Sequence, residues 1–474
     1  MSNKSLNWGV AGILLTALHL ALLYISPQFA YEQDNLSKPI LTFVGIEIAA
    51  GAIYLFVLTD IHRMGPNRSL LIWVIVVGAI LRALMLASTP VLEDDFYRYL
   101  WDGAVTAQGV NPYSFSPDEV SAADKESSVP ASLYQLADEA DEIIWRINHP
   151  GLRTIYPPVA QASFALAYRF KPWSLTAWRL TLLGFDVATL GMLALLLRRL
   201  NLPTLSLTVY WWNPLLIKEA FNSAHMDLVV LPFVLAAVLL AVSGREVLAA
   251  GALGLAVGAK VWPALLLPAV ARTLFAQPKR LIAAVTLFAL LSGAMFFPVF
   301  RAGLDGRSGF TAYSRSWEMN DALFMSILRV SRATVGRLGY EPHHGELLAR
   351  LLIGVTLGAL AVWTMRNKPG AGLRFCENCL IIVAALFLLS PAQFPWYFIW
   401  LIPPLALRPR RSLLLLTLLL PLYYLRFYFS VRDNVKVFDH GIVWLEYAPV
   451  WLLLAHEWYA ARRERLKSVT EATV

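Results

Sequence analysis

The stretch SLLIWVIVVGAILRALMLASTPVLEDDFYRYLWDG (residues 69–103) joins a long apolar run to three consecutive acidic residues. A helix needs about 20 apolar residues to cross a bilayer, so residues 69–88 are long enough to span one. Glu93, Asp94 and Asp95 follow shortly after this run, ahead of several aromatic residues and an arginine. The stretch therefore predicts a membrane-spanning helix that ends in an acidic loop.

The composition extends this prediction to the whole chain. Of the 474 residues, 58% are hydrophobic and only 15% are charged, whereas soluble domains carry about 25% charged residues. The apolar segments that bring the expected total to about fourteen passes are 7–26, 41–59, 69–88, 176–197, 204–221, 226–243, 246–259, 262–273, 281–300, 347–365, 378–391, 396–407, 412–428 and 442–460. We predict an all-α polytopic membrane protein of about 12–14 transmembrane helices, with residues 1–474 forming a single integral membrane domain.

The orientation follows from the basic loops, since cytoplasmic loops carry an excess of Lys and Arg. The basic segments are 60–69, 198–203, 243–246, 271–280, 366–374, 408–412 and 461–467. All of them fall on one side if residues 246–273 form a two-piece hairpin. We therefore expect a protein of the cell membrane with both termini on the cytoplasmic side and the large loops 89–157 and 301–346 on the outer side. Residues 159–170 are too short to cross and are expected to form a re-entrant or surface-lying helix. The basic loops also account for the net charge of +8, so this charge does not suggest that the protein binds nucleic acid.

Polar residues at the predicted outer level suggest a site. Adjacent carboxylates resist simultaneous ionisation, so one member of the 93–95 trio could have a raised pKa and act as a base. A solvated loop turn is the plain alternative. Other polar residues at the same level are His225, Asp227, Lys218, Lys260 and the segments 314–321 and 390–397. Together they predict one wet outward cavity. Deeper in the membrane, Asp186 is expected to pair with Arg179.

Several segments resemble a known superfamily: EDDFYRYLWDGAVTAQGVNPYSFSP (93–117), INHPGLRTIYPPVAQ (147–161), YWWNPLLIKEAFNSAHMD (210–227), GLAVGAKVWPALLLP (254–268) and LLSPAQFPWYFIWLIPP (388–404). They look like polytopic glycosyltransferases of the GT-C superfamily, and most like glycosyltransferase family 87 and bacterial mannosyltransferases that use polyprenyl-phosphate mannose. The resemblance implies a GT-C-like helical bundle and a lipid-phosphate sugar donor used outside the cytoplasm.

The resemblance also suggests roles for particular residues. Asp95 best fits the family acid of the first outer loop, with Asp94 and Glu93 orienting or tuning it. Lys260 and His225 match the junctions at which a cation would meet the donor phosphate, while Lys218 is added from its position alone. Further candidates for substrate binding are Asp227, Arg98, Tyr156, Trp317, Glu318, Gln393 and Trp396. The family acid is usually close to the first helix, so residues 1–60 could be an added helix pair.

The predicted function is an inverting glycosyltransferase, specifically a mannosyltransferase. It would move a sugar from a polyprenyl-phosphate donor to a lipid- or glycan-linked acceptor on the outer face of the membrane. No cofactor is required by this chemistry, although Glu93 and Asp95 could hold a divalent cation. The alternative is a secondary transporter or lipid-sugar flippase that uses the acids as cation sites.

Overall fold

The computed structural model describes residues 3–61, 64–122, 128–366 and 372–472, and within these ranges it contains helices and no β-strand. Nine described helical segments are long and apolar enough to cross a membrane. They are α1 (Asn3–Ile25), α2 (Ile40–Leu58), α3 (Arg68–Leu86), α9 (Leu175–Arg199), α15 (Pro278–Ala302), α18 (Pro342–Trp363), α19 (Gly372–Leu389), the segment Arg411–Ser430 and α25 (Val443–Ala472). The predicted all-α polytopic membrane fold is confirmed.

The other predicted passes are broken helices. Pro214–Asn222 and Met226–Val242, which contain α11 (Pro214–Ile217) and α12 (Leu231–Val242), meet at a bend of 113°. A second break separates α13 (Glu246–Ala259) from the turn Trp262–Leu266 and α14 (Leu267–Arg272), and a third precedes the turn Pro395–Leu401 and α20 (Ile402–Leu407). Within the described ranges, nine helical segments are therefore able to span a membrane, or ten with the bent pair. The remaining predicted passes are shorter helical pieces.

Proline and internal hydrogen bonds explain how these breaks form. Pro214 and Pro263 stand in the first turn of their helices, where the missing N–H removes no helical hydrogen bond. Irregular backbone at membrane depth is tolerated when protein groups satisfy it. At the first break, the N–H of Ser223 donates to Lys218 O at 3.0 Å and that of His225 donates to Glu219 O at 3.0 Å.

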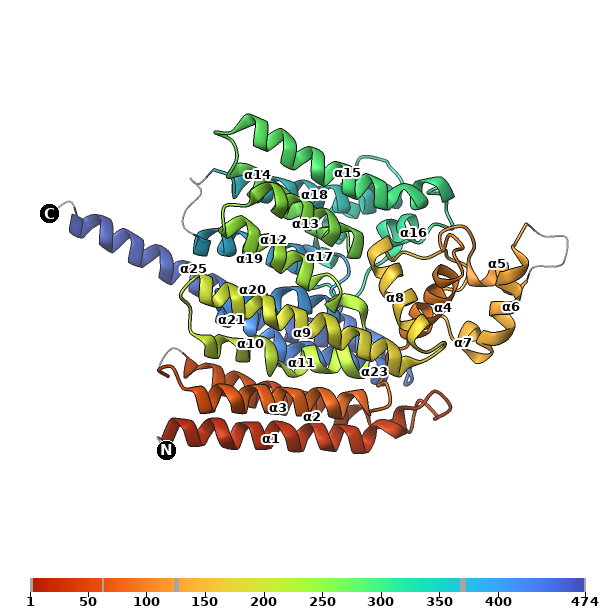
Figure 1. The fold of residues 1–474 in the computed structure, drawn as a ribbon, viewed down its shortest axis with the longest axis horizontal. Coiled ribbons are helices and arrows are strands. Elements are labelled where there is room, and N and C mark those ends of the chain that lie inside the picture. The colour runs from red at the N-terminus through yellow and green to blue at the C-terminus, as the bar shows by residue number, and fades with distance from the viewer. Residues whose placement is uncertain (1–2, 62–63, 123–127, 367–371, 473–474) are drawn as a thin grey trace.

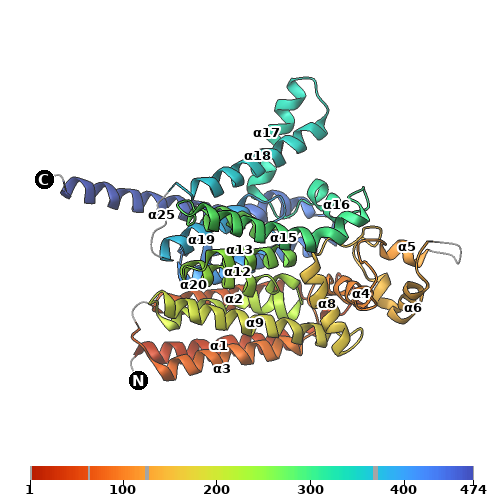
Figure 2. The same ribbon diagram turned by 45° about the horizontal axis from the view of Figure 1, so that its top comes forward.

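The spanning helices run side by side, and two sets of segments lie at opposite ends of the bundle (Figure 1). One set comprises α4 (Phe96–Ala107), α5 (Pro117–Ser121), α6 (Ala131–Ala140), α7 (Glu142–Trp145), α8 (Pro158–Phe170) and α16 (Gly309–Ser316); we call this the loop end. The start of α1 and the end of α25 lie at the other end. The short α8 packs against α4 and α9 and does not qualify as a span. Helices α17 (Ala322–Arg337) and α18 form a hairpin that projects from the bundle (Figure 2).

Contacts between the basic loops bring them together at the end opposite the loop end. Arg280 pairs with Glu246 at 2.7 Å, and Arg272 Nε donates to Met365 O at 2.5 Å. Arg408 and Arg410 both pair with Glu377 at the start of α19. The loops predicted to share one side of the membrane are thus neighbours in space, as a common side requires.

Single cysteines provide a test of sidedness. In a background lacking Cys376 and Cys379, Ser128→Cys places an exposed thiol at the loop end and Ala276→Cys places one in a basic loop. An impermeant thiol reagent added to intact cells should label Ser128→Cys but leave Ala276→Cys unlabelled until the cells are opened. Labelling of Ala276→Cys alone would reverse the orientation. The cysteine-free parent controls for background labelling.

Candidate active site

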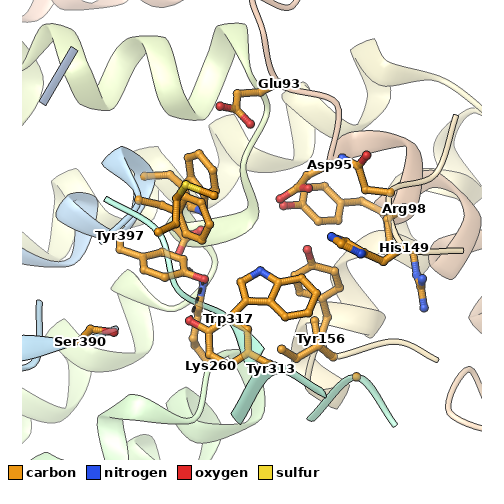
Figure 3. A pocket seen from close by; sticks show the side chains of 18 of the residues that line it. Glu93, Asp95, Arg98, His149, Tyr156, Lys260, Tyr313, Trp317, Ser390 and Tyr397 are labelled. Carbon is orange, nitrogen blue, oxygen red and sulfur yellow. Dashed lines mark hydrogen bonds and ion pairs between the residues drawn. The ribbon is translucent and has the colours of Figure 1, made fainter. Parts of the chain in front are cut away.

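A cavity of about 740 Å³ lies at the loop end, between the extended segments and the broken helices (Figure 3). Its walls come from the segments 92–99, 148–157, 309–319 and 386–400, together with the junction at Lys260. Nine of the predicted site residues line it: Glu93, Asp94, Asp95, Arg98, Tyr156, Asp227, Lys260, Trp317 and Trp396. Segments that are far apart in the sequence therefore meet at one cavity.

The carboxylate of Asp95 faces the cavity and does not cap the helix that follows it. Asp95 precedes α4, and its carbonyl accepts hydrogen bonds from the N–H groups of Arg98 and Tyr99 at 3.0 and 3.3 Å. An aspartate in this position usually caps the helix with its side chain, but here no such bond forms. The side chain is 29% exposed, and Figure 3 shows it facing the labelled residues of the cavity.

The chain that leads into the acids is fixed by Asn222. Its amide oxygen accepts from the N–H of Val91 at 3.0 Å, and its amide nitrogen donates to Ser88 Oγ and Thr89 O at 2.7 Å each. Arg179 adds a hydrogen bond to Ser88 O at 2.8 Å. Both side chains are buried. The first helix break therefore holds the acidic loop, a role that the sequence analysis did not assign to either residue.

His225 lies behind the acids and is not part of the cavity wall. It is fully buried, and its ring stacks on Trp396 at 3.9 Å between centroids. Nδ1 is 3.7 Å from Asp95 Oδ2, and Nε2 is 3.9 Å from Glu93 Oε2 and 3.7 Å from Glu219 Oε2. Its placement favours support of Asp95 over the predicted contact with a donor phosphate.

Lys218 is also behind the cavity. Its ammonium group is buried, lies 3.3 Å from Glu219 and 3.7 Å from the ring centroid of Tyr424, and hydrogen-bonds to the Tyr424 hydroxyl. A charge removed from water in this way needs local partners, and it has them. Lys218 was predicted from its position to contact the donor phosphate, but its side chain faces the interior of the bundle.

Lys260 occupies the predicted helix break and reaches the cavity. It follows the last residue of α13, where the helix dipole favours a cation. Its Nζ donates to Asp227 Oδ1 at 2.6 Å and lies over the rings of Tyr397 and Trp400, at 4.3 and 4.9 Å from their centroids. Trp400 Nε1 also donates to Asp227, at 2.7 Å. An ammonium has three N–H donors, so the contact with Asp227 leaves donors for a ligand.

Two further predicted residues lie outside the cavity. Glu318 pairs with Arg350 at 2.8 Å. Gln393 is buried, and its amide donates to the carbonyls of Leu388 and Ser390 at 3.2 and 3.0 Å. The backbone N–H of Gln393 donates a hydrogen bond to Met319 O at 2.9 Å. Gln393 therefore joins two segments of the cavity wall.

Among the cavity residues that were not predicted individually are Asn148, His149 and Arg153. All three belong to the segment INHPGLRTIYPPVAQ, which contributed to the resemblance only as a pattern. The amide of Asn148 donates a hydrogen bond to Asp94 Oδ1 and lowers the pKa of Asp95. The order of polar residues in that segment was the available signal, but nothing local indicated which side chain would face the acids.

Burial and mutual repulsion change how the acids ionise. Burial, helped by the neighbouring charges of Asp94 and Asp227, raises the pKa of Asp95 to about 7, and Lys260 opposes this shift. Burial also raises the pKa values of Asp94 and Glu93. A carboxyl with a pKa near neutrality can take up a proton at physiological pH more effectively than an ordinary aspartate.

The metal prediction involves only Glu93 and Asp95. Among the described residues, no three His, Cys, Asp or Glu side chains are grouped as they would be around a metal ion. Two carboxylates alone would leave most positions of a hard cation to water or substrate oxygens. A divalent cation at this pair stays a prediction.

The structure is thus a polytopic helical bundle with an acid-lined cavity at one end. A family model described as alpha-(1->6)-mannopyranosyltransferase, N-terminal domain, matches residues 10–276, more than half of the chain. The chain therefore belongs to this mannosyltransferase family and is an enzyme that transfers a hexose. The match includes α2 and α3 as well as the acidic loop. Neither the curated proteins nor the solved structures contain a match to the chain.

Proposed function

We propose that the enzyme transfers mannose from a polyprenyl-phosphate donor to an acceptor hydroxyl with inversion, using Asp95 as the general base. The observation that carries the proposal is the position of Asp95 and Lys260 on one cavity, a proton acceptor and a cation that both face its interior. The family description supplies the linkage, so the attacking group would be the C6 hydroxyl of an acceptor mannose.

The proposed reaction is a single displacement. The acceptor oxygen attacks the anomeric carbon, and its proton passes to the Asp95 carboxylate as the new C–O bond forms. The bond between the anomeric carbon and the phosphate oxygen breaks, and its electron pair leaves with polyprenyl phosphate. A β-linked donor would give the α-glycoside named in the family description. Water and product then carry the proton away from the cavity.

Cations of the cavity would stabilise the leaving phosphate. Lys260 is 20% exposed and has donors beyond the one given to Asp227. Arg98 also lines the cavity, but its guanidinium is bonded to Asp102 and to Leu152 O, each at 2.9 Å. Lys260 is therefore the stronger candidate for the group that meets developing negative charge.

The remaining features of the proposal are the setting and partners. The sugar donor would reach the cavity from the membrane and the lipid- or glycan-linked acceptor from the outer side of a cell membrane. Family membership favours an enzyme over the secondary transporter or flippase that was considered as the alternative. We also propose that the reaction needs no cofactor.

Asp95→Asn tests the base. The amide keeps the shape but cannot accept the proton, so turnover should fall about 100-fold or more, while donor binding and protein yield change little. Transfer of radiolabelled mannose from polyprenyl-phosphate mannose gives the rate. Asp94→Asn is the matched control and should retain substantial activity. An active Asp95→Asn beside an inactive Asp94→Asn would move the base to Asp94.

The raised pKa of Asp95 predicts the pH profile. A base works only when deprotonated, so kcat/KM should be highest above pH 7 and fall about tenfold per pH unit well below it. Asp94 and Asp227 raise this pKa and Lys260 lowers it, so Asp227→Asn should move the acidic limb to lower pH. The donor phosphodiester stays ionised over this range and adds no limb. A flat profile from pH 5 to 8 would argue against Asp95 as the base.

Lys260 variants test the phosphate contact. Lys260→Met should raise the KM for donor at least about tenfold and lower kcat, and Lys260→Arg should keep part of both. Loss of Lys260 also leaves Asp227 buried without its cation, which costs stability. The double variant Lys260→Met/Asp227→Asn removes that defect. A normal donor titration in the double variant would exclude Lys260 from phosphate binding.

A further inference from the structure

The cavity has two chemically different walls. One wall comes from the broken helices and carries Lys260, Tyr397 and Trp400; the other comes from the extended segments and carries Asn148, His149 and Trp317. Figure 3 shows His149 on the same side as Asp95, and Trp317 between His149 and Lys260. Under the proposed function, the acceptor hydroxyl must approach Asp95, so the sugar ring that bears it must rest on residues of that wall.

We propose that Trp317, His149 and Asn148 form the binding subsite for the terminal pyranose of the acceptor. This inference rests on the proposed function and names the group that holds the second substrate. The rings of His149 and Trp317 are 4.7 Å apart at an interplanar angle of 59°. His149 is exposed and Trp317 is half-buried, so the pair presents ring surface to a ligand at the cavity rim.

Asn148 joins this ring pair to the base. It is the residue next to His149; its amide donates a hydrogen bond to Asp94 Oδ1 and lies close enough to Asp95 to lower the pKa of that carboxyl. A pyranose resting on the two rings would therefore have a polar amide and the Asp95 carboxylate at its edge. Sugars present apolar C–H faces and polar hydroxyl edges, and aromatic rings beside polar side chains match both.

The backbone holds the two halves of the subsite together. His149 has a φ of 53°, a left-handed conformation that is uncommon for residues other than glycine. The N–H of Arg153 donates to Arg307 O at 2.9 Å, and its guanidinium donates to Ala302 O at 2.9 Å. Gly309 sits so close to this segment that a Cβ would lie 2.5 Å from Arg153 O. These contacts fix the segment of His149 against the one that carries Trp317.

The opposite wall is less suited to the acceptor. The ammonium of Lys260 already lies over the rings of Tyr397 and Trp400. No described arginine or lysine is stacked on the Trp317 ring. The wall that carries Lys260 suits the donor phosphate. The wall that carries His149 and Trp317 has no cation stacked on the Trp317 ring and suits a neutral sugar.

The test compares acceptor and donor kinetics in the full-length enzyme, with octyl α-mannopyranoside as acceptor and polyprenyl-phosphate mannose as donor. Trp317→Leu should raise the KM for acceptor about tenfold, corresponding to the loss of one ring contact, and leave the KM for donor within about twofold. Trp317→Phe should restore most of the acceptor affinity. Trp145→Leu, at an exposed tryptophan that does not line the cavity, is the matched control and should behave as the parent.

A second variant guards against misfolding. His149→Asn removes the ring but keeps a residue that accepts the left-handed conformation, and it should also raise the acceptor KM. Equilibrium binding of octyl α-mannopyranoside to each variant is measured in parallel, so the subsite is tested even if no transfer is seen. An increase in donor KM alone, or normal acceptor binding in both variants, would overturn the subsite. If Asp95→Asn is inactive while these variants are normal, the subsite fails and the proposed function stands.

Discussion

The hydrogen bonds of Asn222 are the constraint on which the site depends. Backbone that leaves helical geometry within a membrane protein must find partners inside the protein, and the amide of Asn222 serves three groups of the segment 88–91 at once. The same helix break continues into His225, which touches Asp95, and Asp227, which binds Lys260. One irregular junction thus sets the acids and the cation relative to each other.

Much of this arrangement could be predicted from the sequence because hydropathy and helix breaks are local properties. The apolar segments became helices, and the short apolar halves on either side of Lys260 became α13 and α14 with the lysine between them. Charged residues at such breaks are costly unless they serve a purpose. That reasoning placed Glu93, Asp95 and Lys260 at one cavity, although it could not count the full-length spans, since a bent helix and a straight one have similar composition.

The direction of a side chain and the identity of its partner were harder to predict. Asp186 was expected to pair with Arg179, which is close in sequence; it pairs with Arg82 at 2.5 Å, while Arg179 binds backbone carbonyls. Lys218 likewise faces the bundle interior, where Tyr424 and Glu219 receive it. These partners depend on helix rotation and on contacts between distant segments, which the spacing of residues along one helix does not determine.

The backbone is strained at four turns in or beside the segments that build the cavity. Leu92, His149, Ala224 and Asn320 all have φ between 53° and 62°, and each lies in or next to a segment that lines or supports the cavity. Such conformations cost about 1–3 kcal/mol each in non-glycine residues and persist where the surrounding structure requires them. Leu92 and Ala224 turn the chain immediately before Glu93 and His225, His149 packs against Trp317, and Asn320 follows the segment that carries Trp317. The same conformation occurs at Asp141, Trp173, Asn201 and Asp433, which do not line the cavity, so strain alone does not mark the site. Its importance at the cavity comes from position, because the turns at Leu92, Ala224 and His149 set where Glu93, His225 and Asn148 stand.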